Sequence, residues 1–266
     1  MSLSITRRLA VAGALMAAAV AMAVPAAAQT VDEIKSKGKV TIGMLVDFPP
    51  FGITTAEGKP DGYDADVAKL LAKHMGVPVE IVPVTGPNRI PYLLTNKVDL
   101  LVASLGITPA RAEQVQFSEP YAAIEIGLVA PAATKIKDAT ELSGKRIGVA
   151  RASTQDNSLT AVAPKDARIM RFDDDASAVQ AMLSGQVDAL GLSNVVTKEI
   201  KKLAPQANYE MKFVLNRQVQ GIAMRKDQEA LLKWVNGFLE TVKSSGELNE
   251  IHKKWLGTDL PPLTKS

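Results

Sequence analysis

The sequence of 266 residues contains no cysteine and only two histidines, His74 and His252. Without cysteine the chain can form no disulfide and has no thiol chemistry. The two histidines are far apart and have no nearby acidic residues at metal-ligand spacing, so we predict no metal site. The sequence also lacks a nucleophile elbow, a phosphate-binding loop and a dinucleotide fingerprint, and we therefore expect no cofactor.

A strong charge of one sign is missing as well. Lys and Arg number 31 against 28 Asp and Glu. The basic residues form no cluster with interleaved aromatics, which argues against nucleic acid or a membrane surface as a partner. The chain is long enough to fold on hydrophobic burial alone.

The one long apolar run in the sequence lies at the N-terminus. Residues 9–24 follow Arg7 and Arg8 and precede the small residues 26–28. This order of charged, apolar and small residues is typical of a secretory signal. A retained membrane anchor is the alternative, but a run of about 16 residues is shorter than the roughly 20 that span a bilayer. We therefore expect residues 1–28 to be a signal peptide that is cleaved before Gln29 in an exported protein.

The rest of the chain alternates short β-branched runs with helical patterns, which predicts an α/β protein with mainly parallel strands. The apolar residues of the stretch 64–75 recur at helical spacing. Residues 94–104 align without gaps on residues 183–193, and both read as helix end, tight turn, Val-Asp, apolar strand and Ser. Helix-turn-strand units resemble one another in general, but this repeated order favours two similar lobes over one large sheet.

The C-terminal part is expected to return to the first lobe. Lobe 1 would then comprise residues 29–126 and 219–266, with lobe 2 formed by residues 127–218. Two segments, near 124–130 and 215–221, would cross between the lobes. Such a pair would form a hinge, with a ligand cleft between the lobes.

The segment 104–111 follows a predicted strand and opens a helix. Thr108 suits the N-cap and Pro109 the first helical position. Arg111 then stands at the third position, where a cation opposes the helix dipole by roughly 0.3–1 kcal/mol. A bound anion would explain this cation, because free N–H groups, the Thr108 hydroxyl and the guanidinium together make a carboxylate-sized pocket. Gly106 would let the backbone approach the ligand closely.

Arg111 has an alternative explanation, which is an ion pair at the surface with Glu113 or Glu119. Spacing alone does not separate the two. The C-terminal end of a parallel strand is where open α/β sheets bind ligands, and this position favours the anion site.

The second lobe offers a matching anchor after its first predicted strand. Ser153 or Thr154 would cap the next helix, with donors facing the same cleft. Ser193 and Asn194 close the strand that follows the second Val-Asp pair. Capping alone also explains Thr154, and a turn explains Asn194. Phe48, near the end of the first strand, could cover the apolar part of a solute.

Six short motifs occur in order along the chain after the leader. They are FPPF at 48–51, GYDADVA at 62–68, SLGITPAR at 104–111, FSEPY at 117–121, GQVDA at 185–189 and KWLG at 254–257. Together they resemble the polar amino acid type of periplasmic solute-binding protein, family 3, a component of ABC importers. The resemblance implies a two-lobed periplasmic-binding-protein fold that closes on an amino acid or related small carboxylate. It also implies delivery to a membrane permease by a periplasmic protein, which we expect to be a monomer.

The resemblance further implies roles for single residues. Arg111 would grip the ligand α-carboxylate, helped by the backbone at Gly106, near Ser104, and by Thr154 from the other lobe. Phe48 would stand over the ligand side chain. Asn88, or Arg89 beside it, could reach the cleft.

One position departs from the family pattern. Five residues after the equivalent of Asp188, many members carry an Asp that accepts from the ligand α-amino group. This chain has Ser193 there, followed by Asn194. Recognition of the amino group would then rest on neutral acceptors, or the ligand is not a standard α-amino acid.

Two other functions remain open at this point. The same fold resembles that of some periplasmic dehydratases, and an enzyme would need a cleft acid, for which Asp47 and Glu125 are the candidates. A sensor would pass its signal to a membrane receptor instead of a permease. The identity of the ligand is not specified by the sequence.

Overall fold

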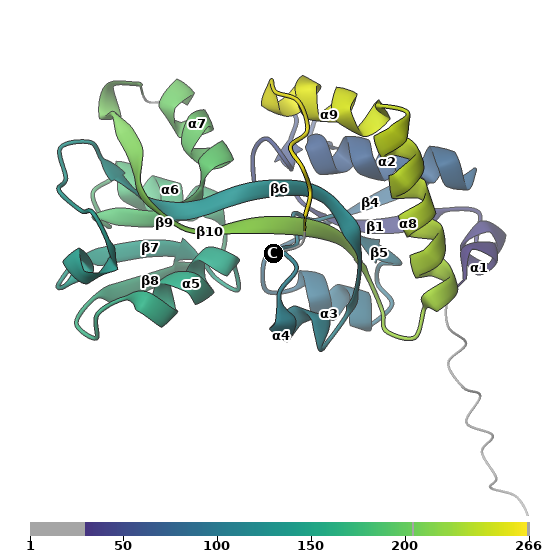
Figure 1. Cartoon of the computed structure of the whole chain (residues 1–266), viewed down its shortest axis with the longest axis horizontal. Helices are drawn as coiled ribbons and strands as arrows, with labels where there is room; N and C mark the ends of the chain where they lie inside the picture. Colours follow the sequence, from purple (N-terminus) through teal and green to yellow (C-terminus); the bar gives the residue numbers. More distant parts are fainter. Residues whose placement is uncertain (1–29, 204, 265–266) are drawn as a thin grey trace, which may run out of the picture.

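The computed structural model describes residues 30–203 and 205–264, so the expected signal peptide and its cleavage site lie outside the described residues. The described part consists of two lobes joined by two long strands, β6 (Gln116–Pro131) and β10 (Tyr209–Met224) (Figure 1). No helix of this part is both long enough and apolar enough to cross a membrane.

Lobe 1 is built mainly from the N-terminal third of the chain and from its C-terminal helices. Its elements are α1 (Val31–Ser36), β1 (Val40–Leu45), β2 (Ile53–Thr54), β3 (Pro60–Asp61), α2 (Tyr63–Met75), β4 (Val79–Val84), α3 (Arg89–Leu94), β5 (Leu100–Leu101), α4 (Pro109–Ala112), α8 (Glu229–Ser244) and α9 (Glu247–Leu256). The helix α2 includes the periodic stretch 64–75 and buries Val67, Leu71 and Met75. The return of the C-terminal part is also visible in the packing of α9 against α2 and α8.

Lobe 2 is formed by the chain between the two long strands. Its elements are the 3-10 helix η1 (Ala139–Leu142), β7 (Arg146–Ala150), α5 (Thr154–Val162), β8 (Arg168–Phe172), α6 (Asp175–Leu183), β9 (Ala189–Ser193), α7 (Asn194–Leu203) and the 3-10 helix η2 (Pro205–Ala207). Strands and helices alternate here as they do in lobe 1, which is the α/β pattern that the sequence predicts.

A single eight-stranded sheet runs through both lobes in the order β4-β1-β5-β10-β6-β9-β7-β8. In lobe 1, β1 pairs in parallel with β4 and β5, and in lobe 2, β7 pairs in parallel with β8 and β9. The strands β6 and β10 pair antiparallel with each other, and the expected crossings near 124–130 and 215–221 lie within this pair. Its register shifts at several places, including between Val214 and Asn216. Such irregularities bend strands, so the pair can act as the hinge.

The two Val-Asp pairs play the same part in the two lobes. The carboxylate of Asp99 accepts a hydrogen bond from the backbone N–H of Thr41 at 2.9 Å. The carboxylate of Asp188 accepts one from the backbone N–H of Arg146 at 2.8 Å. Each aspartate therefore ties the start of its strand to the start of the neighbouring parallel strand. This shared contact gives a structural basis for the internal similarity of the sequence.

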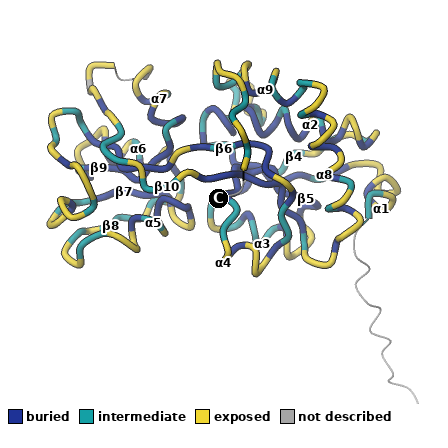
Figure 2. Tube along the Cα trace, in the orientation of Figure 1, coloured by how far each residue is buried: buried dark blue, intermediate teal, exposed yellow. Residues whose placement is uncertain are grey.

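The core follows the sheet. Buried residues line β1, β5, β9, most of β6 and the C-terminal half of β10, whereas the helices are exposed on their outer faces (Figure 2). Trp234, Trp255 and Phe117 pack against the large core cluster. Because both faces of the parallel strands are covered, the strand ends at the lobe boundary are left as the place where polar groups gather.

Candidate functional site

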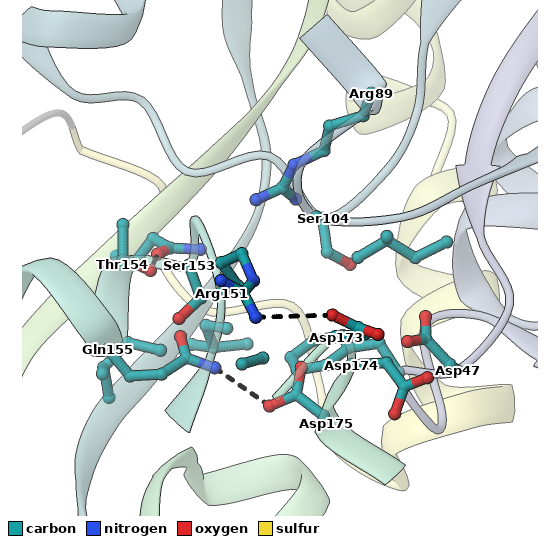
Figure 3. Close-up of a pocket in the computed structure, with 17 residues that line it drawn as sticks. Asp47, Arg89, Ser104, Arg151, Ser153, Thr154, Gln155, Asp173, Asp174 and Asp175 are labelled. Atoms are coloured by element: carbon teal, nitrogen blue, oxygen red, sulfur yellow. Dashed lines mark hydrogen bonds and ion pairs between the residues drawn. The ribbon is translucent and has the colours of Figure 1, made fainter. Parts of the chain in front are cut away.

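A cavity lies between the lobes, at the ends of strands β1, β5 and β7. Its walls contain four of the residues that the sequence singles out as ligand contacts, namely Phe48, Ser104, Ser153 and Thr154. The cavity is also lined by Arg89 and Asp47, which the sequence named as residues that could lie in the cleft. Gln155 and Asp175, also labelled in Figure 3, line it as well and were not predicted. The site is therefore built from both lobes.

Arg111 is buried at the boundary between the lobes, with an exposed fraction of 8%. Its N–H is capped by the Thr108 hydroxyl at 3.3 Å, so Thr108 is the N-cap that the sequence predicts. One guanidinium nitrogen donates to the Gly106 carbonyl at 2.9 Å, and the other donates to the Ala152 carbonyl of lobe 2 at 3.0 Å. Burial, and then the charge of Arg89, lower the pKa of Arg111 to about 9.

Arg89 is a second buried guanidinium beside the first, with an exposed fraction of 5%. It stands at the start of α3 and donates to the Ala103 carbonyl at 3.0 Å and to the Ala152 carbonyl at 3.4 Å. Burial lowers its pKa to about 10. Arg89 and Arg111 thus reach the same carbonyl across the lobe boundary.

Neither guanidinium forms an ion pair with a carboxylate among residues 30–203 and 205–264. The surface alternative for Arg111, pairing with Glu113 or Glu119, is therefore not found in the described structure. A buried cation without a counter-ion is unfavourable. The carboxylates of Asp175 and Asp47 act on Arg89 without contacting it and partly offset its charge. Arg111 lies beside the like charge of Arg89, so an anion next to Arg111 would be strongly stabilised.

Ser104 holds a left-handed backbone conformation at the end of β5, with φ of 47°. Its hydroxyl donates to one oxygen of Asp64 at 2.8 Å, and its N–H donates to the Tyr121 hydroxyl at 3.2 Å. The Tyr121 hydroxyl in turn donates to the other oxygen of Asp64 at 2.7 Å. Burial raises the pKa of Asp64 to about 7. This network fixes the loop that leads from β5 to α4.

In lobe 2, Ser153 is the N-cap of α5, and its hydroxyl accepts from the Asp156 N–H at 3.1 Å. Thr154 donates its hydroxyl to the side-chain oxygen of Gln218, a residue of the crossing strand β10. The position next to Gly106 is filled by the same Gln218 side chain, which a Cβ at residue 106 would meet at 2.3 Å. Gln218 was missed at the sequence level because only the fold brings β10 to both helix starts.

Phe48 lines the cavity with an exposed fraction of 5%, and its ring centroid lies 5.9 Å from that of Phe51. Phe51 is fully buried and belongs to the core of lobe 1. Of the two aromatics of the FPPF motif, Phe48 is thus the one that faces the site.

Six predicted contacts are not among the residues that line this cavity. Three of them, Gly106, Thr108 and Arg111, belong to the loop before α4 and to its start, and the other three are Asn88, Ser193 and Asn194. Asn88 accepts from the Thr85 N–H at 2.8 Å at the start of α3, and the cavity is lined by its neighbour Arg89 instead. Ser193 is fully buried, and its hydroxyl accepts from the Val196 N–H at 3.3 Å as the cap of α7. Asn194 lines a separate groove beside α9. Capping therefore accounts for Ser193, whereas Asn88 binds the turn before α3 and Asn194 accepts from the Glu125 N–H at 3.3 Å.

The lobes are in close contact at the rim of the cavity. A Cβ added to Gly86 of lobe 1 would come within 2.7 Å of the Arg151 carbonyl of lobe 2. Glycine at this position lets the two backbones approach, so the conformation is a closed one. The described residues contain no cluster of His, Cys, Asp and Glu that could hold a metal ion.

Comparison with known proteins places the chain in a family. Residues 40–258 match the model of the bacterial extracellular solute-binding proteins, family 3. The ABC transporter glutamine-binding protein GlnH of Bacillus subtilis (strain 168) is 32% identical, and the match covers 86% of this chain and 85% of GlnH.

Solved structures agree with this placement. The solute receptor for L-cysteine of Neisseria gonorrhoeae is 34% identical with a TM-score of 0.80, over 86% of this chain and 94% of the receptor. An ancestral amino acid-binding protein, AncCDT-1, a precursor of cyclohexadienyl dehydratase, is 33% identical with a TM-score of 0.80, over 85% of this chain and 99% of its own. The two-lobed sheet, the cavity between the lobes and these matches agree, and the chain belongs to the bacterial extracellular solute-binding proteins of family 3.

Proposed function

We propose that this chain is the periplasmic solute-binding component of an ABC importer, and that it closes on an amino acid whose carboxylate is held by Arg111 and Arg89. The observation that carries this proposal is the pair of buried guanidiniums, which have no carboxylate partner in the described structure. The names of the relatives support an amino acid as ligand, since they include glutamine-, cystine- and arginine-binding proteins.

The mechanism follows from where the donors come from. Arg111 and Arg89 belong to lobe 1, whereas the start of α5, with Ser153 and Thr154, belongs to lobe 2. A carboxylate between them receives hydrogen bonds from both lobes only when the lobes are closed. Since a ligand shifts a conformational equilibrium by its differential affinity for the two states, these contacts favour closure. Phe48 covers the apolar part of the ligand.

Closure also creates the surface that a membrane partner would recognise. It joins the two lobes into one composite surface, and we propose that the permease of an ABC importer reads this surface as the loaded state. The protein would act as a monomer in the periplasm after cleavage of residues 1–28 before Gln29. A role as sensor for a membrane receptor uses the same closure, and pull-down of permease against receptor separates the two.

An enzymatic function on the same fold is the second candidate. Asp47 lines the cavity, and burial raises its pKa to about 6, which suits an acid catalyst. The other candidate acid, Glu125, is exposed and does not line the cavity. The dehydratase named with the ancestral protein AncCDT-1 motivates the test, which is incubation with prephenate. We expect no turnover, and product formation would favour the enzyme.

Thermal denaturation with paired ligands tests the proposed function. Each L-amino acid is compared with an amine that lacks only the carboxylate, such as L-lysine with cadaverine, L-histidine with histamine and L-arginine with agmatine. Ligand at about 1,000 times its dissociation constant should add roughly 4 kcal/mol to the free energy of unfolding. We expect stabilisation by one or a few amino acids and none by the matched amines. Equal stabilisation by an amine would remove the carboxylate from the interaction.

A further inference from the structure

The wall of the cavity that lies opposite the Arg89 guanidinium is acidic. Asp47 follows β1 in lobe 1, and Asp174 and Asp175 stand at the start of α6 in lobe 2. Figure 3 shows the three carboxylates gathered on one side of the cavity, with the guanidinium of Arg89 on the other. The cavity therefore has a cationic end and an anionic end, and each end takes groups from lobe 1.

Asp47 has an unsatisfied oxygen on this wall. Its Oδ1 is completely enclosed and has no hydrogen-bond partner. Burial, followed by the charge of Asp174, raises the pKa of Asp47. An enclosed carboxylate oxygen without a donor is costly, so the arrangement invites a donor that the described chain does not supply.

Asp175 completes the wall from the other lobe. Its exposed fraction is 7%, and it accepts one hydrogen bond, from the Gln155 side chain at 3.0 Å. Asp174 caps α6 by accepting from the Ser177 N–H at 2.6 Å. None of Asp47, Asp174 and Asp175 forms an ion pair within the described part of the chain. Closing the lobes brings these like charges together, and the charge of Arg89 offsets only part of the repulsion. Burial and the neighbouring carboxylates still raise the pKa of Asp47 and of Asp175, so a ligand cation between them would favour closure.

The sequence predicted that Ser193 takes part in recognition of the amino group, but its side chain does not line the cavity. It is fully buried and caps α7. The acidic wall is the remaining place in the cavity with charged acceptors.

We propose that Asp47 and Asp175 hold the ammonium group of the ligand, so that an α-amino acid spans the cavity from this wall to the guanidiniums of Arg89 and Arg111. The inference rests on the proposed function and narrows the ligand to molecules with both a carboxylate and a free amino group. It makes the ligand itself the bridge between Asp47 of one lobe and Asp175 of the other.

Isothermal titration with matched pairs of ligands tests the inference. The pairs are L-cysteine with 3-mercaptopropionate, L-glutamine with glutaramate and L-arginine with 5-guanidinopentanoate, in which the second member lacks only the α-amino group. For the amino acid that binds the wild-type protein, we expect Asp47→Asn and Asp175→Asn each to weaken affinity by about tenfold or more. The deaminated partner should bind the wild type more weakly and lose nothing further in these variants.

Two controls separate the role in binding from a role in folding. Asp173→Asn removes a neighbouring charge whose side chain is 88% exposed and paired with Arg151, and it should change affinity by less than about threefold. Asp47→Asn should also raise the melting temperature of the ligand-free protein, because it removes an enclosed charge without a donor. A loss of affinity together with a gain in stability is the result that a merely structural role would not produce.

The outcomes distinguish this inference from the proposed function. If an amino acid binds the wild type, and Asp47→Asn and Asp175→Asn bind it as tightly as Asp173→Asn does, the ammonium assignment is wrong and the binding function stands. If none of the amino acids binds the wild type, the proposed function fails and the assignment fails with it.

Discussion

Each lobe presents a strand-loop-helix junction to the cavity, β5–α4 in lobe 1 and β7–α5 in lobe 2, and the two junctions differ at one decisive position. In lobe 1 the helix α4 is capped by Thr108 and carries Arg111 at its third position. In lobe 2 the helix α5 is capped by Ser153 and carries Asp156 at its third position. An acid at that position favours the helix dipole and a cation opposes it.

The contacts of the Asp156 and Arg111 side chains explain the difference. Asp156 is satisfied within lobe 2, where it accepts from the Arg171 guanidinium at 3.0 Å and from the Thr160 hydroxyl at 3.1 Å. Arg111 reaches out of its own lobe to the Ala152 carbonyl. The junction of lobe 2 is therefore arranged for stability, whereas that of lobe 1 accepts a local electrostatic cost and holds a cation ready for a ligand.

The largest effect on ligand affinity should come from replacing Arg111, the third residue of α4, by a residue that is common at helix starts. Arg111→Gln places there a residue type that suits a helix start but removes the guanidinium. We expect ligand affinity to fall by about 100-fold or more, since charge-assisted hydrogen bonds contribute roughly 1.5–3 kcal/mol each. Isothermal titration with the amino acid identified by thermal denaturation measures the change. Arg168→Ala, at an exposed position of β8, is the control, and equal affinities of the two variants would contradict the assignment.

The next largest effect concerns the pH dependence of stability and involves Asp64, the buried acid that binds the left-handed residue Ser104 in lobe 1. The left-handed residue of the lobe 2 junction, Ala152, has no side-chain donor for such an acid. Because burial raises the folded-state pKa of Asp64 to about 7, its contribution to stability is present below the unfolded value and is lost as pH rises toward 7. Because asparagine does not ionise, Asp64→Asn removes this loss of stability at higher pH. The free energy of unfolding of the variant, relative to wild type, should therefore rise by about 1–3 kcal/mol between pH 5 and pH 8.

Urea denaturation of the ligand-free protein at the two pH values provides the measurement for Asp64→Asn. Asp32→Asn, on α1 near the surface, serves as the control for general charge effects. A difference between wild type and Asp64→Asn that does not change with pH would show that Asp64 is ionised normally in the folded protein.

A smaller effect is expected from removing the acid at the start of α5. Asp156→Ala deletes the pair with Arg171 and the favourable charge at the helix start, and should lower the free energy of unfolding by about 1–2 kcal/mol. Affinity for ligand should stay within about threefold of wild type, as Asp156 faces away from the proposed contacts. Denaturation and titration on the same sample measure both. A large loss of affinity without a loss of stability would place Asp156 in the binding machinery and remove the contrast with Arg111.

The smallest effect should come from the left-handed residue of lobe 2. Ala152 has φ of 58°, a conformation that costs a residue with a Cβ roughly 1 kcal/mol. Ser104, the left-handed residue of the β5–α4 junction, has φ of 47° but is held by Asp64 and Tyr121. Ala152→Gly should therefore stabilise the protein by about 0.5 kcal/mol, whereas Ser104→Gly should destabilise it. Thermal denaturation of both variants checks the opposite signs.

Much of the fold followed from patterns along the chain. The alternation of strand and helix signals and the repeat of 94–104 in 183–193 predicted two α/β lobes, and Asp99 and Asp188 indeed make equivalent contacts. The capping roles of Thr108 and Ser153 were also predictable, because a cap depends on residues within one turn of it. Ser193 shows the same locality, because its hydroxyl accepts from the Val196 N–H three residues on and its side chain does not line the cavity.

The sequence by itself determined the chemistry of each helix start and the alternation of strands and helices, because these depend on residues a few positions apart. Only the tertiary structure decided that Arg89 and Arg111 share the Ala152 carbonyl, that Gln218 reaches Thr154 across 64 residues, and that Asp47 faces Asp175. These contacts join different lobes, and their existence depends on how the β6–β10 pair sets one lobe against the other. A pattern read along the chain carries no information about that relative placement.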